Sequence, residues 1–179
     1  MQLKNRNMSN ILSSGLAVVA VACMMLLVLQ SCNVYSFKQG SIPAEVQTIS
    51  IANIYNESGG GPPNLGQIFT EKLKSYYQQN SRLKLVNSNG DWQLEGRILT
   101  YQSTGVAPQG DKARLNRLTI TLQAKFISLT DEKANFEQAF SFFTDYPQEQ
   151  TLTLVEADLI QLISDQIVID IFNKTTSNW

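Results

Sequence analysis

The sequence contains no histidine at all. A chain without imidazole lacks the most common general base, the Ser/His/Asp relay and the usual nitrogen ligand of zinc. Basic side chains are also few, since 14 Lys and Arg stand against 15 Asp and Glu. A nucleic-acid binder needs a basic stripe to displace counterions from phosphates. We therefore expect no nucleic-acid partner, no cofactor and no metal site.

The chain has one long apolar run, the fourteen residues from Leu16 to Leu29, and it follows a segment that carries Lys4 and Arg6. A basic start followed by a short apolar stretch is typical of a signal peptide. The alternative is a transmembrane anchor. Fourteen helical residues rise only about 21 Å, which is less than the ~30 Å hydrocarbon core of a bilayer. We therefore interpret residues 1–31 as a signal peptide.

Cysteine is nearly absent, and the position of Cys32 is informative. The apolar run ends in Leu29-Gln30-Ser31-Cys32, which resembles a bacterial lipobox, where the Cys sulfur is alkylated with diacylglycerol. The other cysteine, Cys23, would leave with the signal peptide, so no disulfide could form in the mature chain. A chance free thiol is the alternative. Several acyl chains on Cys32 would anchor the protein stably to a membrane.

The residues after Cys32 indicate which membrane face is occupied. No acidic residue occurs between Cys32 and Glu45. An acidic cluster just after the lipidated Cys directs export to the cell surface in some Gram-negative groups, and an Asp immediately after it retains lipoproteins at the inner membrane in others. The lack of both favours the periplasmic face of the outer membrane. We expect a lipidated linker over residues 32–45 and a single domain over residues 46–179.

The pattern of residues 46–179 predicts an α+β fold. Apolar alternation or β-branched runs predict strands, and 3.6-residue spacing predicts two helices, one opened by Asn64 and one by a capping box at Thr153 and Glu156. The turn at 87–90 predicts a hairpin, with a positive φ at Gly90. The expected strands cover residues 46–55, 83–86, 92–98, 117–126 and 135–146.

The element order β, α, β, β, β, β, α predicts a two-layer sandwich with a mostly antiparallel sheet of four to five strands and two helices packed on one face. The inward side chains expected on the strands are Trp92, Leu94, Ile98, Leu118, Ile120, Leu122, Ala124, Phe126, Phe136, Phe140 and Phe142. On the last helix the expected buried stripe includes Leu159, Leu162, Ile163 and Ile167. Phe143 must then lie on the outer face of the sheet.

The segment from Ser103 to Arg114 is longer than a hairpin connection requires, and long loops are often functional. Lys112, Arg114 and Arg117 gather at its end and are suited to phosphate groups. The alternative is a solvated loop without a ligand, in which Asp111 offsets part of the positive charge.

Other segments of the chain favour structural roles. The glycines at 59–61 lack the Lys and Ser/Thr of a phosphate loop, so we interpret them as a flexible connection. The carboxylate pairs Glu156/Asp158 and Asp165/Asp170 are poorly spaced on a helix for joint acid/base work, so no catalytic residue is assigned and no enzyme is expected.

The chain resembles the LptE family of lipopolysaccharide-assembly lipoproteins, in a divergent form. Each matching piece is short, but their order and spacing are specific. The resemblance rests on Cys32-Asn33-Val34-Tyr35-Ser36-Phe37, Ile51 to Asn56, Pro63-Asn64-Leu65 with Phe69-Thr70, Gly90-Asp91, Leu94-Glu95-Gly96-Arg97-Ile98 with Tyr101, Asn116 to Ile120, Asp170-Ile171-Phe172-Asn173 and Trp179.

This resemblance implies a small α/β sandwich that sits inside the outer-membrane β-barrel LptD, helps it assemble and assists delivery of lipopolysaccharide to the outer leaflet. It implies that basic side chains bind lipopolysaccharide, while the choice of Lys112, Arg114 and Arg117 follows from charge and loop position. Two alternatives stay open. One is a periplasmic lipid- or glycan-binding lipoprotein that acts alone, and the other is an envelope hydrolase that uses Glu156 or Asp165.

The lipobox yields a direct test. Intact-mass analysis of the mature protein should show an N-terminal residue 32 carrying acyl chains, because the thiol is the acceptor. An unmodified N-terminus, or recovery of the protein from the cytosol, would contradict the interpretation of the first 45 residues.

Overall fold

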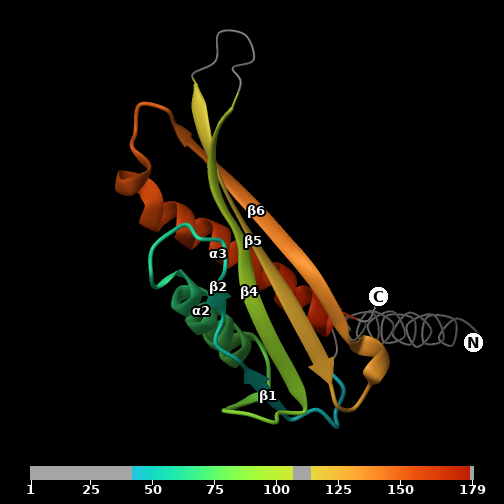
Figure 1. Ribbon diagram of the computed structural model, residues 1–179. Helices are drawn as coiled ribbons and strands as arrows, with labels where there is room; N and C mark the ends of the chain where they lie inside the picture. Colours follow the sequence, from blue (N-terminus) through green and yellow to red (C-terminus); the bar gives the residue numbers. More distant parts are fainter. Residues whose placement is uncertain (1–41, 107–113, 178–179) are drawn as a thin grey trace, which may run out of the picture. The chain divides into compact units, whose positions relative to one another are not determined.

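The computed structural model describes residues 42–106 and 114–177, which fall within one compact unit of the chain, residues 39–179. Two long helices and a sheet form two layers, with both helices on one face of the sheet (Figure 1). The elements, labelled as in Figure 1, are β1 (Thr48–Ile51), β2 (Tyr55–Asn56), α2 (Leu65–Asn80), β3 (Lys84–Val86), β4 (Trp92–Val106), β5 (Leu115–Ser128), the 3-10 helix η2 (Glu132–Ala134), β6 (Phe136–Pro147) and α3 (Leu152–Thr176).

The sheet has the strand order β3-β1-β4-β5-β6, and the short strand β2 also pairs with β4. The long strands β4, β5 and β6 are antiparallel, whereas β1 runs parallel to both β3 and β4. The predicted α+β sandwich with a mostly antiparallel sheet is therefore confirmed. The sheet has six strands instead of four to five, because the expected strand 46–55 is interrupted after Ile51 and resumes at Tyr55.

The predicted hairpin between β3 and β4 is wrong, because β1 lies between these two strands. The connection crosses β1 at very close range. A Cβ on Gly90 would lie 2.5 Å from the backbone nitrogen of Ser50, so only glycine fits there. The positive φ that the sequence predicted at Gly90 belongs to Asn89, whose φ is 54°. Gly90 is thus required for close approach and not for a turn.

Asp91 fastens the start of β1 to the start of β4. Its Oδ2 atom accepts hydrogen bonds from the backbone nitrogens of Gln47 and Thr48 and from the Thr48 hydroxyl, each at 2.9 Å. The same hydroxyl accepts a bond from the Asp91 backbone nitrogen. These donors stabilise the carboxylate, so the Gln47 amide first, and then the Thr48 groups, hold the pKa of Asp91 below its usual value.

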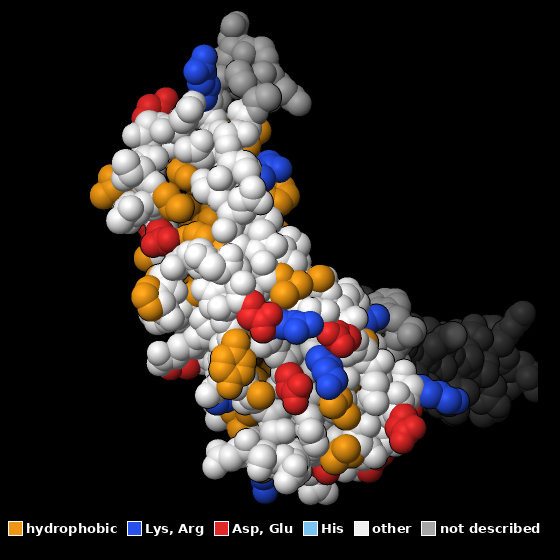
Figure 2. Space-filling model, viewed as in Figure 1, with side chains coloured by type: hydrophobic (Ala, Val, Ile, Leu, Met, Phe, Trp, Pro, Cys, Tyr) orange, Lys and Arg blue, Asp and Glu red, His pale blue; other side chains and the backbone are white. Residues whose placement is uncertain are grey.

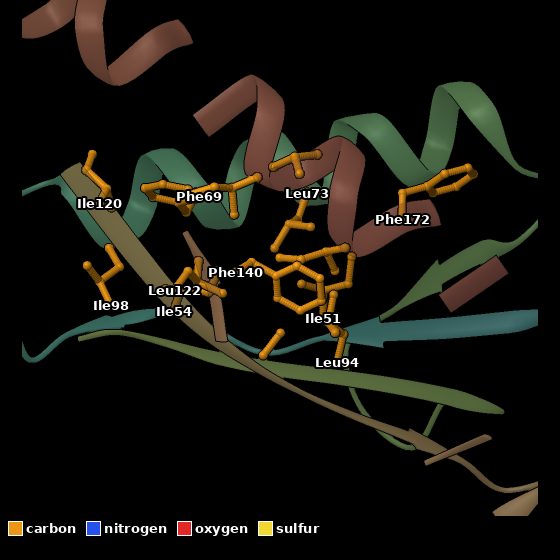
Figure 3. Close-up of a cluster of buried hydrophobic side chains, with 14 of the residues drawn as sticks. Ile51, Ile54, Phe69, Leu73, Leu94, Ile98, Ile120, Leu122, Phe140 and Phe172 are labelled. Atoms are coloured by element: carbon orange, nitrogen blue, oxygen red, sulfur yellow. The ribbon is translucent and has the colours of Figure 1, made fainter. Parts of the chain in front are cut away.

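The core fills the space between the sheet and the two helices (Figure 3). The period-two pattern of β5 is confirmed, since its five predicted inward side chains are at most 1 % exposed. Trp92, Leu94 and Ile98 of β4 are buried as predicted, as is Phe140 of β6. The helices contribute Leu65, Phe69, Leu73, Tyr77, Leu159, Ile160, Ile163, Ile167, Val168, Ile171 and Phe172.

A β-bulge at Leu99 changes which way β4 faces. The register with β5 shifts between Ile98 and Thr100, which leaves Leu99 without a partner and 41 % exposed. An extra residue in one strand moves all later side chains to the opposite face. Tyr101 therefore pairs with the inward residue Ile120 and reaches the helix layer.

The start of α3 differs from the prediction. The helix begins at Leu152 with Thr151 as its N-cap, and no side chain caps it, so the capping box at Thr153 and Glu156 is wrong. Leu162, predicted to be buried, is 56 % exposed. α3 is apolar around most of its circumference, so its sequence does not show which stripe faces the sheet.

The contact between α2 and the segment after β1 depends on Gly66. A Cβ there would lie 2.2 Å from the carbonyl oxygen of Ile54. One turn later, Thr70 donates to the Gly66 carbonyl at 2.8 Å and accepts from the Ile54 amide at 2.9 Å. The helix therefore lies directly against the backbone of the β1–β2 connection.

This contact predicts that Gly66→Ala destabilises the protein by about 1–3 kcal/mol, because the backbone must move to admit the methyl group. In an ordinary helix the same change would stabilise. Chemical denaturation measures the difference. Gly105→Ala is the matched control, since its Cβ would meet nothing closer than 3.9 Å. A Gly66→Ala protein as stable as the parent would refute the close contact.

Candidate functional site

The polar face of the sheet is the candidate functional surface. It is the face opposite the helices, and its side chains occupy the odd-numbered positions of β5 and β6, as the alternation predicted. Figure 2 shows acidic and basic side chains gathered together on the corresponding side of the molecule. The face contains two charged clusters, which lie at different heights along β5.

The first cluster surrounds an open hollow of about 520 Å³ on this face. β1, β2, β4, β5 and β6, or the segments next to them, all contribute to its lining. The lining residues are Ala52, Asn53, Tyr55, Glu57, Glu95, Gly96, Arg97, Gln123, Lys125 and Glu137. Tyr55 is 69 % exposed, so an aromatic ring stands in solvent at a polar hollow.

Arg97 connects the side chains of this hollow. Its Nε donates to Oε1 of Gln123 at 3.0 Å, and its other nitrogens lie 3.6 Å from Glu137 and 4.0 Å from Glu57. Gln123 in turn donates from Nε2 to Oε1 of Glu137 at 2.8 Å. Each of the three charged side chains is about half exposed. The network therefore fixes their orientation while leaving part of each accessible to solvent.

The second cluster is centred on Arg117. Its Nε and one terminal nitrogen donate to the two carboxylate oxygens of Asp145 at 2.7 and 2.9 Å, and its guanidinium carbon lies 3.6 Å from the centre of the Phe143 ring. The Asp145 hydrogen bonds raise the pKa of Arg117, and the guanidinium lowers the pKa of Asp145. Phe143 lies on the outer face, as predicted, and stacks on the cation.

The three basic residues predicted at the loop have different surroundings. β4 continues to Val106 and β5 begins at Leu115, so part of the predicted loop 103–114 is strand. Lys112 lies outside the described residues. Arg114 is exposed, and its carbonyl accepts a hydrogen bond from the Gln148 amide at 3.1 Å. Arg117 is already engaged by Asp145 and Phe143, whereas Arg114 has no ion-pair partner among the described residues.

Tyr101 joins the sheet, α3 and the glycine segment. Its hydroxyl donates to Oε1 of Glu156 at 2.5 Å, and burial, followed by this carboxylate, raises the pKa of Tyr101. A Cβ on Gly60 or Gly61 would lie about 3 Å from the Tyr101 ring. Gly60 and Gly61 are therefore packed against an aromatic ring, whereas a Cβ on Gly59 would meet nothing within 4 Å. The sequence did not predict this contact of the glycine connection with Tyr101.

The carboxylates considered for acid/base chemistry do not converge. Glu156 is held by Tyr101, Asp165 is paired with Lys72, and Asp170 accepts from Gln166 at 2.9 Å. Nine residues separate Glu156 from Asp165 on α3, which is about 13 Å along the axis. Within residues 42–106 and 114–177, no group of three or more acidic or cysteine side chains is arranged to hold a metal ion.

Among the described residues, no helix has the length and apolar character that a bilayer crossing requires. This applies to α2 and α3. The N-terminal apolar run lies outside the described residues.

Comparison with known proteins identifies the family. The sequence profile of LptE, described as lipopolysaccharide-assembly, matches residues 46–175. The chain belongs to the LptE family. The resemblance inferred from the sequence is thereby confirmed. This is a family of lipopolysaccharide assembly and not a family of enzymes. No curated protein matches the chain in sequence.

Two solved structures share the fold of this chain at low sequence identity. Protein XCC0632 from Xanthomonas campestris is 13 % identical with a TM-score of 0.52, over 75 % of this chain and 86 % of its own. The hypothetical protein CT253 from Chlamydia trachomatis is 9 % identical with a TM-score of 0.51, over 74 % and 99 %. A minor lipoprotein from Acinetobacter baumannii is 16 % identical with a TM-score of 0.49, over 73 % and 93 %.

Sequence reasoning identified the polar face but missed the hollow. The alternation of β4 placed Arg97 and Glu95 outward, and that of β5 did the same for Gln123 and Lys125. It did not show that Tyr55 pairs with Arg97, because β2 has only two residues and lies parallel to a strand distant in sequence. The only earlier signal was an aromatic residue at the end of a predicted strand.

The Arg117 cluster predicts a pH-dependent contribution to stability. The pKa of Asp145 is lower in the folded than in the unfolded chain. Its ion pair therefore stabilises fully above about pH 4, and this stabilisation is lost as the pH falls through the folded pKa. Asp145→Asn should cost about 0.5–1 kcal/mol at pH 7 and progressively less as the pH falls below about 4.

Thermal unfolding of both proteins from pH 7 to pH 2 measures this effect. Asp158→Asn is the control, because Asp158 is exposed and has no ion-pair partner among the described residues. A difference between parent and Asp145→Asn that stays constant with pH would show that the carboxylate charge is irrelevant.

Proposed function

We propose that this LptE-family protein is an outer-membrane lipoprotein, held at the periplasmic face by acyl chains on Cys32, that plugs and helps assemble the LptD β-barrel. In this role it assists lipopolysaccharide on its way to the outer leaflet. The observation that carries the proposal is the family match over residues 46–175. The lipobox ending at Cys32 supports the anchor.

The chemistry of the described surface supports a place inside a polar lumen. The interior of a large outer-membrane barrel is polar and wet, in contrast to its lipid-facing outside. The outer face of the sheet offers the matching chemistry, since its arginines and Lys125 are paired with carboxylates across the strands. Such a surface contacts a polar wall through many modest hydrogen bonds and does not require a large apolar patch.

We further propose that the hairpin end of β4 and β5 contacts the phosphate groups of lipopolysaccharide through Lys112, Arg114 and Arg117. Arg114 supports this assignment best, because it is exposed at that end and lacks an ion-pair partner among the described residues. Arg117 contributes a charge whose geometry Asp145 already fixes. A phosphate would then meet a guanidinium that is oriented in advance.

Partner binding is tested by affinity purification of the full-length protein from detergent-solubilised outer membrane. LptD should be recovered in stoichiometric amount, and depletion of the protein should lower lipopolysaccharide at the cell surface. A Cys32→Ala variant should leave the membrane fraction. Repeated purification without the barrel would contradict the plug and would favour the alternative, a lipid- or glycan-binding lipoprotein that acts alone.

The phosphate assignment predicts that the double variant Lys112→Ala/Arg114→Ala co-purifies several-fold less lipopolysaccharide at unchanged melting temperature, because two exposed cations are lost. Higher ionic strength should weaken retention by the parent. Arg117→Ala should reduce both lipopolysaccharide and melting temperature, since it also breaks the pair with Asp145. Lys133→Ala is the control for a cation far along the sheet. Unchanged lipopolysaccharide in the double variant would refute the assignment.

A further inference from the structure

The hollow around Arg97 is a concave part of the outer face that the plug would present to the barrel wall, and it has the properties of a binding site of its own. Its volume of about 520 Å³ lies within the range of small-molecule sites. Its polar groups come from five strands or their flanking segments and are held by one another, as described for Arg97, Gln123 and Glu137. A ligand would therefore meet groups that are already oriented.

Tyr55 supplies the apolar part of this site. It lines the hollow, it pairs with Arg97 across β2 and β4, and it is 69 % exposed. An aromatic ring exposed to this extent contributes little to the stability of the fold. It offers a flat apolar surface with a polar hydroxyl at one end. The hollow thus combines one aromatic platform with several planar hydrogen-bonding side chains.

The charge of the hollow limits which class of ligand it can bind. Its lining carries three carboxylates, Glu57, Glu95 and Glu137, against two cations, Arg97 and Lys125. Arg97 lies near Glu57 and Glu137, and Lys125 lies 3.9 Å from Glu95. A site with excess negative charge repels phosphates and carboxylates. It accepts neutral or cationic ligands.

We propose that the hollow binds a saccharide that carries no anionic group. A pyranose has an apolar face of C–H groups, which would pack on Tyr55, and a rim of hydroxyls that donate and accept. Carboxylates and the Gln123 carbonyl accept from hydroxyls, and Arg97 donates to them. An amino sugar would also satisfy the excess negative charge. This site does not depend on the barrel, and it lies apart from the hairpin end, where Arg114 would meet phosphate.

Two envelope materials offer such sugars: the saccharide part of lipopolysaccharide and the amino-sugar glycan of the cell wall. The experiment uses the full-length acylated protein in detergent micelles and measures binding by saturation-transfer NMR and calorimetry. The probes are chitotetraose, a lipid-free core oligosaccharide stripped of phosphate, and glucosamine compared with glucosamine 6-phosphate. Binding of either oligosaccharide supports the site, and the tighter of the two identifies the source.

Tyr55→Ala should weaken oligosaccharide binding about tenfold, because the stacking surface is lost. Tyr55→Phe keeps that surface and should bind within about threefold of the parent. Gln123→Leu should also weaken binding, because it removes hydrogen-bonding groups from the hollow while the Tyr55 ring stays in place. Leu154→Ala, which removes a side chain that is 79 % exposed on α3, is the control and should change nothing.

Three results would overturn the proposal. One is that the parent binds neither oligosaccharide at about 10 mM. Another is that Tyr55→Ala binds as well as the parent at equal melting temperature. The third is a preference for glucosamine 6-phosphate over glucosamine. None of these results bears on recovery of LptD, so this site and the plug fail or succeed separately.

Discussion

The antiparallel pairing of β5 with both β4 and β6 is the constraint on which the rest of the structure depends. β5 lies between the two other long strands, and its register with β6 is uninterrupted over twelve residue pairs. Because side chains alternate along it, one strand supplies both the apolar floor under the helices and the polar outer face. Arg117, Gln123 and Lys125 all owe their positions to this register.

The parts of the fold predicted correctly are those governed by local periodicity. The alternation from Leu118 to Phe126 identified both faces of β5 because each side chain reports on its own burial. The outward position of Phe143 followed from the same rule. The family resemblance added what periodicity does not contain, namely lipopolysaccharide assembly, and the profile match over residues 46–175 confirmed it.

The parts predicted wrongly depend on contacts between distant segments. A turn sequence at 87–90 resembles a hairpin, but it does not show that β1 occupies the space between the flanking strands. Leu162 looked buried because α3 has apolar residues on several sides, and only packing decides among them. Glu156 looked like a helix cap, whereas Tyr101 reaches it after the bulge at Leu99.

The outer face of the sheet neutralises its own charges, and this has a consequence for its behaviour in a crowded envelope. Arg97 lies near Glu137, two strands away on β6, and Lys125 of β5 lies near Glu95 on the adjacent strand β4. A polyanion gains little from this part of the face, away from the hairpin end, because it must first displace a carboxylate that is already paired with the cation. Non-specific binding is therefore weak, and only a surface that replaces several of these ion pairs at once can bind stably. This part of the face therefore binds only a partner whose polar groups match its pattern of charges.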